Sequence, residues 1–204
     1  MYVLRLTGSR LLTYPLIVSG MFMGCSSFNQ DIGNWNVGNV EYMVAMFYRA
    51  TSFNQDLNWD TSKVVDMTEM FFGATKFNGD VGGFPVINVK NMDMMFAFCT
   101  DFNQDISGWA PLNVVSMEGM FENASSFNQN ISVWPVSVKL QNINAMFYRA
   151  ASFDQNMCNW STATALQATS RLFPAVFWHT SCPDSTVGHA DFTEGPAPYM
   201  CYAC

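Results

Sequence analysis

Apolar residues recur along this chain in a fixed order, and the clearest marker of that order is a Met-Phe pair. Successive pairs lie 24 to 26 residues apart, and a degenerate seventh copy, Leu172-Phe173, keeps the spacing. Tandem repeats of this length form solenoids, in which each coil buries its apolar side chains against its neighbours. The six complete pairs are Met21-Phe22, Met46-Phe47, Met70-Phe71, Met95-Phe96, Met120-Phe121 and Met146-Phe147.

Two further markers keep the same register. A Ser-Phe-Asn-Gln-Asp segment, complete at 27–31 and 52–56 and varied in later copies, follows each pair. A large aromatic residue lies six or seven positions beyond the Phe of that segment. Three markers in one register indicate a single repeat unit that runs from about Val18 to Phe173. The aromatic residues are Trp35, Trp59, Phe84, Trp109, Trp134 and Trp160.

The residues around each Met-Phe pair have helical spacing. Val40, Met43, Met46, Phe47 and Ala50 stand at i, i+3, i+6, i+7 and i+10. This spacing is typical of one face of an α-helix. It therefore predicts one short helix in each coil, over 40–50 in the second copy.

The Ser-Phe-Asn-Gln-Asp segment alternates with the period of a β-strand. Phe28, Gln30 and Ile32 fall on one face of such a strand, and Asn29 and Asp31 fall on the other. Strands of stacked coils pair in parallel at about 4.8 Å per step. The chain is thus expected to be an α/β solenoid of about six coils, each with a short helix and a short parallel strand.

The repeat divides the chain into three parts. Residues 1–13 are expected to be a remnant coil or an N-terminal cap, residues 14–173 the repeat solenoid, and residues 174–204 a cysteine-containing C-terminal cap. The apolar run near the N-terminus is short, contains Pro15 and has no Ala-x-Ala cleavage site, so it makes a poor secretion signal. This leaves open that the chain is a fragment of a longer protein.

The composition fits a buried repeat. Apolar residues make up 50% of the chain and charged residues 12%, with 15 Met and 18 Phe, and so much apolar surface collapses rather than staying disordered. The Met residues recur along the chain instead of clustering, which favours a core role over copper or cofactor ligation, so no cofactor is expected. The net charge of −7 argues against nucleic-acid binding. No run of about 18 uncharged apolar residues predicts a transmembrane helix.

The order Val-x-x-Met-x-x-Met-Phe, followed by Ser-Phe-Asn-Gln-Asp-Ile-Ser-x-Trp, resembles the repeat of the BspA-like leucine-rich-repeat surface proteins. That repeat is known from bacterial surface lipoproteins and from secreted proteins of microalgae. The resemblance implies a leucine-rich-repeat-like solenoid, exposed at or outside the cell surface, that mediates adhesion or binds proteins or glycans without enzymatic activity. The third coil departs from the pattern with Phe84-Pro85 in place of Trp, and the last coil is eroded.

Four of the six cysteines lie at or beyond the last coil. Cys158, Cys182, Cys201 and Cys204 are disulfide candidates that would tie the tail over the apolar end of the solenoid, which needs a cap. A bridge between Cys158 and Cys182 is preferred, although four cysteines allow three pairings. A zinc site built from the four thiolates and a redox-active Cys-x-x-Cys at the chain end are the alternatives. Disulfides imply an oxidising compartment.

The other two cysteines, Cys25 and Cys99, occupy a column that holds Ala in other coils, so both are predicted to be small buried residues. They stand three coils apart, about 14 Å at strand spacing, which exceeds the Cα separation of about 7 Å that a disulfide tolerates.

An acidic column follows the predicted strand and continues as Asn130 and Asn156. One interpretation is a calcium ladder on the solvent face. The favoured one is that each side chain accepts backbone N–H bonds in a turn, because Asn turns equally well but binds cations poorly. A neighbouring column of Asn is expected to form an amide ladder between coils. The acidic column is Asp31, Asp56, Asp80 and Asp105, and the Asn column is Asn29, Asn54, Asn78, Asn103 and Asn128.

Tyr48, Phe72 and Tyr148 share the column after the Met-Phe pair. A half-buried packing role is favoured for them, and exposure for contact with a partner is the alternative. With the acidic column they form the candidate contact surface. Catalysis has no visible residues to carry it, because the two histidines, His179 and His189, lie in the tail and no catalytic or metal motif occurs.

Asn123, Asn130 and Asn159 each begin an Asn-x-Ser sequon, which is a glycosylation site if the source is eukaryotic. Asn123 is the better candidate, since Asn130 borders the predicted strand.

The expected function is therefore non-enzymatic adhesion or binding, outside the cell or at its surface, toward an unknown surface protein or glycan. A structural role in a cell wall or surface layer, with solenoids stacked end to end, is the alternative. It ranks lower because the tail is expected to block one end of the solenoid.

The disulfide cap makes a testable prediction. Adding reductant to the intact chain is expected to speed proteolysis within 174–204, because the tail is then no longer tied to the last coil. Limited proteolysis followed by mass spectrometry measures this. Cleavage of the tail at the same rate with and without reductant would contradict the cap.

Overall fold

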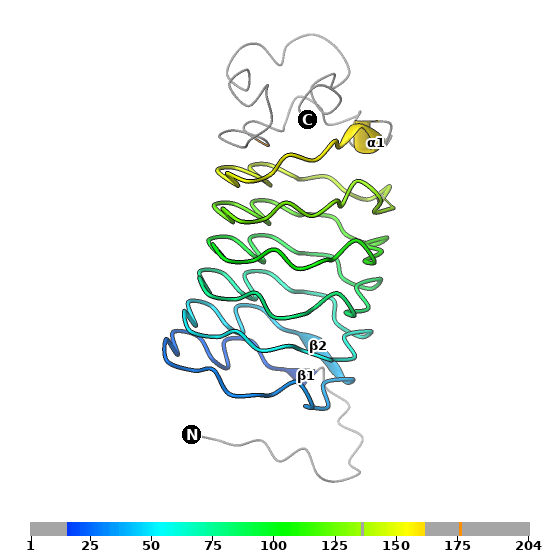
Figure 1. Ribbon diagram of the computed structural model, residues 1–204. Helices are drawn as coiled ribbons and strands as arrows, with labels where there is room; N and C mark the ends of the chain where they lie inside the picture. The colour runs from blue at the N-terminus through cyan, green and yellow to red at the C-terminus, as the bar shows by residue number, and fades with distance from the viewer. Residues whose placement is uncertain (1–15, 136, 162–175, 177–204) are drawn as a thin grey trace.

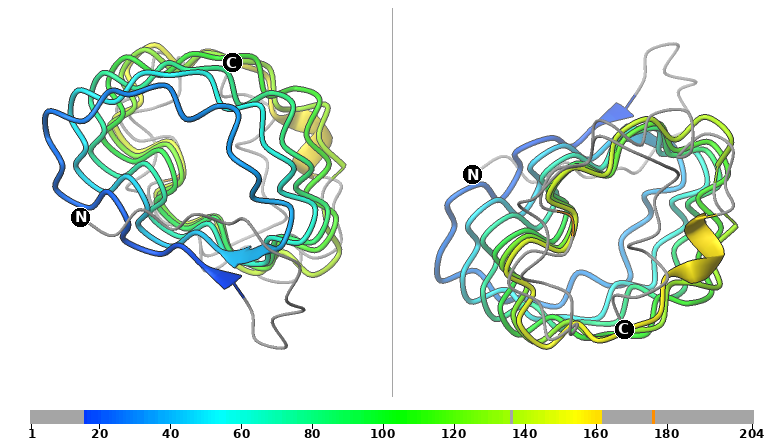
Figure 2. Two further views of the ribbon diagram at one scale, coloured as in Figure 1. Left: turned by 90° about the horizontal axis from the view of Figure 1, so that it is seen from below. Right: turned by 90° about the horizontal axis from the view of Figure 1, so that it is seen from above.

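The chain winds into coils that are stacked one above the other. A computed structural model describes residues 16–135, 137–161 and 176. Figure 1 shows the stack from the side, and Figure 2, looking along it, shows that the coils nearly superimpose. The predicted tandem repeat is therefore confirmed. Coils 1 to 6 begin, in this order, at Val18, Met43, Met67, Met92, Met117 and Ile143.

Regular secondary structure is sparse. Strand β1, Leu16–Ile17, pairs in parallel with β2, Val40–Tyr42, and a short helix α1 spans Cys158–Ser161. Single parallel bridges continue the pairing from coil to coil through Tyr42, Asp66, Asn91, Ser116 and Asn142. Parallel pairing between coils was expected, but it lies just before the Met-Phe segment and not in the Ser-Phe-Asn-Gln-Asp segment.

The segment predicted to be helical is not a helix. In coil 2 it consists of two four-residue turns, in which the N–H of Met46 donates to the carbonyl of Met43 at 3.2 Å and the N–H of Ala50 donates to that of Phe47 at 2.9 Å. The third residue of each turn, Ala45 or Arg49, has a positive φ of 54° or 55°, as in a type II turn. The helix prediction is therefore wrong, although the inward positions that it assigned are right.

Hydrogen bonds between coils explain why turns replace the helix. A helix uses its N–H groups internally, whereas the two turns leave every second N–H free to donate to the next coil. These bonds are 2.6 to 3.0 Å long in coil 2. The donors are Met43, Ala45, Phe47 and Arg49, and their acceptors are the carbonyls of Asp66, Thr68, Met70 and Phe72.

Each coil consequently contains two residues in the left-handed region. A non-glycine residue there costs about 1–2 kcal/mol, because its Cβ approaches the following carbonyl. Four of the twelve positions are glycine and none is β-branched. One column is Gly20, Ala45, Glu69, Met94, Gly119 and Ala145, and the other is Gly24, Arg49, Gly73, Phe98, Asn123 and Arg149.

Stacked aromatic rings fill the interior. The Phe of each Met-Phe pair stacks on its counterpart in the next coil at 5.3 to 5.8 Å between centroids, and the Phe of the Ser-Phe-Asn-Gln-Asp segment does so at 5.7 to 6.0 Å. In coils 2 to 6 these rings and the Met beside them are 0 to 1% exposed. The indole N–H of Trp59 donates to the carbonyl of Ile32 in coil 1, so this column adds polar links between coils. The predicted core is confirmed in coils 2 to 6, whereas in coil 1 Trp35 is 43% exposed and Met21 and Phe22 are half-buried.

The Ser-Phe-Asn-Gln-Asp segment alternates as predicted but is not a strand. Phe53 and Leu57 are buried while Asn54 and Asp56 are exposed. The backbone N–H of Asn54 donates to the side-chain oxygen of Asn29 in the previous coil at 2.8 Å. The same bond recurs up the stack, so an Asn ladder does connect the coils, with each amide oxygen accepting a backbone N–H. Its later donors are Asn78, Asn103, Asn128 and Asp154.

The stack continues past coil 6 at an unexpected residue. The N–H of Phe147 donates to the carbonyl of Val176 at 2.9 Å, whereas in coils 2 to 5 the equivalent N–H donates to the Met of the next Met-Phe pair. Val176 is 7% exposed and thus takes the Met position. The pair chosen from spacing, Leu172-Phe173, lies outside the described residues and four positions earlier.

The two described cysteine side chains differ in environment. Cys99 is buried as predicted, and its thiol donates to the carbonyl of Phe71 at 2.9 Å. Burial raises the pKa of this thiol well above its usual range. Cys25 is exposed, so its predicted burial is wrong, because it lies in the first described coil and has a described neighbour on one side only. Both thiols are free. The side chains of Cys158, Cys182, Cys201 and Cys204 lie outside the described part of the chain.

The left-handed columns can be tested with glycine substitutions. Gly119 has a φ of 57°, whereas Gly108 does not lie in the left-handed region and has open space around its Cβ position. Gly119→Ala is expected to lower the free energy of unfolding by about 1 kcal/mol. Gly108→Ala, the control, is expected to leave it unchanged or raise it slightly. Urea unfolding measures both; equal effects would contradict the role assigned to the column.

Candidate functional site

A row of aromatic side chains reaches the surface on the turn segment of coils 2 to 4. Tyr48 and Phe72 are half-buried and stack at 4.7 Å with an interplanar angle of 6°, and Phe98 follows at 5.2 Å and 51°. Phe98 is 39% exposed, whereas the buried rings of the core in coils 2 to 6 are at most 3% exposed. We call Tyr48, Phe72 and Phe98 the aromatic ridge. Two of its members were candidates from sequence, and the structure brings them into contact.

Phe98 belongs to a different sequence column from its two neighbours, which is why the column pattern missed it. Coil 4 has Ala97 in the column of Tyr48 and Phe72. The next residue, Phe98, occupies a left-handed turn position, and its ring packs against Phe72. One indication of this was present in the sequence, a large aromatic residue directly after the small Ala97.

Arginines border the aromatic side chains. The guanidinium carbon of Arg49 lies 5.3 Å from the ring centroid of Tyr48, and that of Arg149 lies 5.1 Å from the ring centroid of Tyr148, in coil 6. Such distances allow a cation–π attraction. Tyr148 is not part of the aromatic ridge, because coil 5 lies between them and has Glu122 in the same column.

Glu122 interrupts the aromatic column with a partly buried carboxyl group. Loss of hydration raises the pKa of this group, and the nearby Arg149 opposes the shift. Its Oε1 accepts a hydrogen bond from the Asn123 amide at 3.3 Å. The carboxylate at this position therefore costs stability at neutral pH.

The acidic column lies on the surface and closes turns. The Oδ1 atoms of Asp31, Asp80 and Asp105 accept the N–H of the residue two positions later at 2.8 to 3.0 Å. Hydrogen bonds from the Ser107 side chain and backbone lower the pKa of Asp105. The turn interpretation is thereby confirmed for these three. Among the described residues, no group of three or more His, Cys, Asp or Glu side chains could hold a metal ion.

Asp56 behaves differently because coil 2 is one residue short. Only Asn58 stands between Leu57 and Trp59, where the other coils have two residues. Asp56 instead accepts the backbone N–H of Asp80 in coil 3 at 2.8 Å. The missing residue leaves a notch in the otherwise regular wall.

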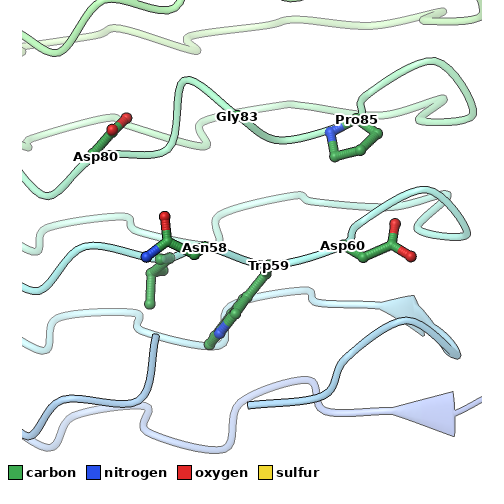
Figure 3. A pocket seen from close by; sticks show the side chains of 7 residues that line it. Asn58, Trp59, Asp60, Asp80, Gly83 and Pro85 are labelled. Atoms are coloured by element: carbon green, nitrogen blue, oxygen red, sulfur yellow. The ribbon is translucent and has the colours of Figure 1, made fainter. Parts of the chain in front are cut away.

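The notch is an open recess of about 450 Å³ between coils 2 and 3. Figure 3 shows Asp80 at one end and Asp60 at the other, with Gly83 and Pro85 above Trp59. Hydrogen bonds from Ser62 lower the pKa of the Asp60 carboxyl, so this end of the notch carries a negative charge at neutral pH. The short turn was visible in the sequence as the one 24-residue spacing.

The three sequons occupy different environments. Asn130 is exposed, and its Oδ1 accepts both the N–H and the hydroxyl of Ser132 at 3.1 and 2.7 Å. Asn123 is half-buried with a φ of 54°. Asn159 lies in α1 and its side chain is exposed. Asn130 is thus more exposed than Asn123, which the sequence favoured.

The described part of the chain contains no helix with the length and apolar character that crossing a bilayer requires.

Glu122 yields a prediction with a defined pH dependence. Its pKa is raised above the ordinary value of 4.5, so the penalty is present above that raised pKa and disappears as the carboxyl group is protonated at lower pH. Glu122→Gln is expected to raise the melting temperature at pH 7, with a smaller gain near pH 4. Asp101→Asn, an exposed control, is expected to show no comparable gain at pH 7. Calorimetry at both pH values measures the melting temperatures. If the gain in melting temperature from Glu122→Gln were larger at pH 4 than at pH 7, the charged Glu122 carboxylate would not be the source of the destabilisation.

Comparison with known proteins supplies a family but no functional assignment. No curated protein and no solved structure matches the chain. One family matches twice, over residues 17–84 and 57–160, and these overlapping ranges cover most of the chain and nearly all of the described coils. The chain therefore belongs to the family described as "Mycoplasma protein of unknown function, DUF285".

Proposed function

We propose that this chain is a non-enzymatic binding module of the BspA-like kind that its repeat resembles, acting outside the cell or at its surface. The observation that carries the proposal is the aromatic ridge. Tyr48, Phe72 and Phe98 present ring surface to solvent on three successive coils. They are not part of the core, whose aromatic rings stand in other columns and are buried in coils 2 to 6.

The composition around the ridge suits an interface. Aromatic residues and Arg are enriched where proteins bind one another, because they bury much area and retain a polar end. Tyr48 and the adjacent Arg49 combine these properties at one end of the ridge. Phe98 supplies the most exposed ring at the other end.

The ring geometry favours a protein partner over a glycan. A sugar stacks on an open ring face, but Tyr48 and Phe72 place one face of each ring against the other at 4.7 Å. These two faces are closed to a sugar, and Tyr48 and Arg49 add a hydroxyl and a guanidinium beside the rings. These groups suit side chains and backbone carbonyls of a protein surface.

The surface location rests on two features. The repeat resembles that of surface proteins, and four cysteines lie at or beyond the last coil, which suits an oxidising compartment. The acidic column adds negative charge along a separate part of coils 1 to 4.

The test compares the ridge with an exposed apolar residue on another segment. The intact chain, fluorescently labelled, is applied to an array of extracellular protein domains and to a glycan array. Binding to at least one protein is expected, and Phe72→Ser combined with Phe98→Ser should weaken it at least tenfold, as loss of a central aromatic contact does. Val133→Ser, at a residue that is 56% exposed on another segment, is the control and should bind normally.

Each variant is first checked for an unchanged circular dichroism spectrum and melting temperature. Absence of protein binding, or binding that the double substitution leaves intact, would contradict the proposal. Binding confined to glycans would show that the partner class is wrong.

A further inference from the structure

The notch between coils 2 and 3 is a recess with a carboxylate at each end. Its volume of about 450 Å³ falls within the range of about 300–1,000 Å³ that is typical of small-molecule sites. Asp80 stands at one end and Asp60 at the other (Figure 3). The rest of the lining carries no charge and consists of Leu57, Asn58, Trp59, Gly83 and Pro85.

Two departures from the repeat coincide at this recess. The first is the short turn of coil 2, where Asn58 alone separates the inward Leu57 from Trp59. The second is Asp60, since coil 2 is the one described coil with a carboxylate directly after the large aromatic residue. The other coils stack without either feature, so the repeat itself requires neither. Their residues at the position of Asp60 are Asn36, Pro85, Ala110, Pro135 and Ser161.

The charged groups around the notch favour a cation. Asp56 adds a third carboxylate near the Asp80 end, where it accepts the backbone N–H of Asp80 at 2.8 Å. Lys63 follows Asp60 in the chain and opposes this charge in part. Its ammonium group donates to the side-chain oxygen of Asn39 in coil 1 at 2.6 Å, so it is held on the side of coil 2 that faces away from the notch.

Both end carboxylates can accept further hydrogen bonds. The Oδ1 of Asp80 accepts the N–H of Gly82 at 2.8 Å, and the Oδ1 of Asp60 accepts the N–H of Ser62 at 3.0 Å. A carboxylate offers about four lone-pair sites. Each end of the notch therefore retains acceptors for a charged donor.

We propose that the notch binds an aliphatic diammonium ion, which is a short alkyl chain with an ammonium group at each end. One ammonium group donates to Asp60 and the other to Asp80, and the methylene groups between them cross the uncharged wall. A dication attracts both carboxylates at once, whereas a single ammonium group reaches only one of them.

The arrangement does not suit a metal ion. A bound calcium or magnesium ion contacts its oxygen ligands at about 2.0–2.6 Å, so one ion cannot reach both ends of the recess. In the part of the chain that the structure describes, no three His, Cys, Asp or Glu side chains are grouped closely enough to hold one.

This site is separate from the aromatic ridge. The notch follows the acidic column within the coil, whereas the ridge lies on the turn segment that precedes that column. Diamine binding and the proposed protein binding can therefore be lost independently of each other.

The experiment is isothermal titration calorimetry of the full chain in phosphate buffer of low salt at pH 7. The probes are the terminal diamines diaminobutane and diaminopentane, with butylamine as the matched monoamine. At least one diamine is expected to bind at one site per chain, at least tenfold more tightly than butylamine. Added salt should weaken this binding, because it screens charges at an open site.

Amide substitutions test the two carboxylates. Asp60→Asn and Asp80→Asn are each expected to weaken diamine binding at least tenfold. Asp105→Asn, in the acidic column of coil 4, is the matched control and should bind normally. Asn keeps the turn of this column intact, as Asn130 shows by accepting the N–H of Ser132 at 3.1 Å.

Filling the recess tests its shape. A Cβ at Gly83 meets no atom within 4 Å, so Gly83→Val places a side chain in the mouth of the notch without a clash and is expected to abolish diamine binding. Gly108, at the same position in coil 4, has equally open surroundings, and Gly108→Val is the control that should bind normally. Each variant is first checked for an unchanged melting temperature.

No diamine binding by the unaltered chain, or equal affinity for diamines and butylamine, would overturn the proposal. Diamine binding that survives both Asp60→Asn and Gly83→Val would overturn it as well. A Gly83→Val protein that loses the diamine and still binds the protein array would agree with two separate sites.

Discussion

The structure depends on the hydrogen bonds that every second N–H of the turn segment donates to the next coil. Such bonds join each described coil to the next. Gly20 of coil 1 donates to coil 2, Arg49 of coil 2 donates to coil 3, and Phe147 of coil 6 donates to the carbonyl of Val176. They require the chain to turn twice in each coil with φ positive at the third position. Local strain of about 1–2 kcal/mol at a non-glycine position is thus offset by a bond that joins two coils.

Once the backbone is fixed in this way, side chains can only form columns. Within coils 2 to 6 the residues of a core column all face inward, so Phe stacks on Phe and Trp on Phe or Trp at nearly constant separation. A side chain of the wrong size affects two interfaces at once. The low charge of the chain has the same origin, because a coil of about 25 residues uses most of its positions for the core and for polar turns.

The sequence was sufficient to predict the repeat, the buried Met and Phe columns and the Asn ladder, because each depends only on periodicity. It misidentified the turns as a helix because two successive turns also direct positions 43, 46, 47 and 50 inward. Glycine at 73 and 119, inside the expected helices, was the contrary signal, since glycine disfavours a helix interior and favours a left-handed residue. The exposure of Cys25 could not be read from its column, because the column gives every coil the same environment, whereas coil 1 has a described neighbour on one side only.

Surface features follow less from the repeat than from its exceptions. The notch exists because coil 2 lacks one residue, and Phe98 reaches the aromatic ridge from a neighbouring column. The backbone hydrogen bonds between the turn segments of successive coils are kept at all of these places. Some outward side chains add bonds of their own between coils, as Asn29 and Asp56 do. Many surface residues of such a solenoid can therefore vary without altering its fold, and membership of a family defined by the repeat identifies the architecture but not the chemistry of the outward columns.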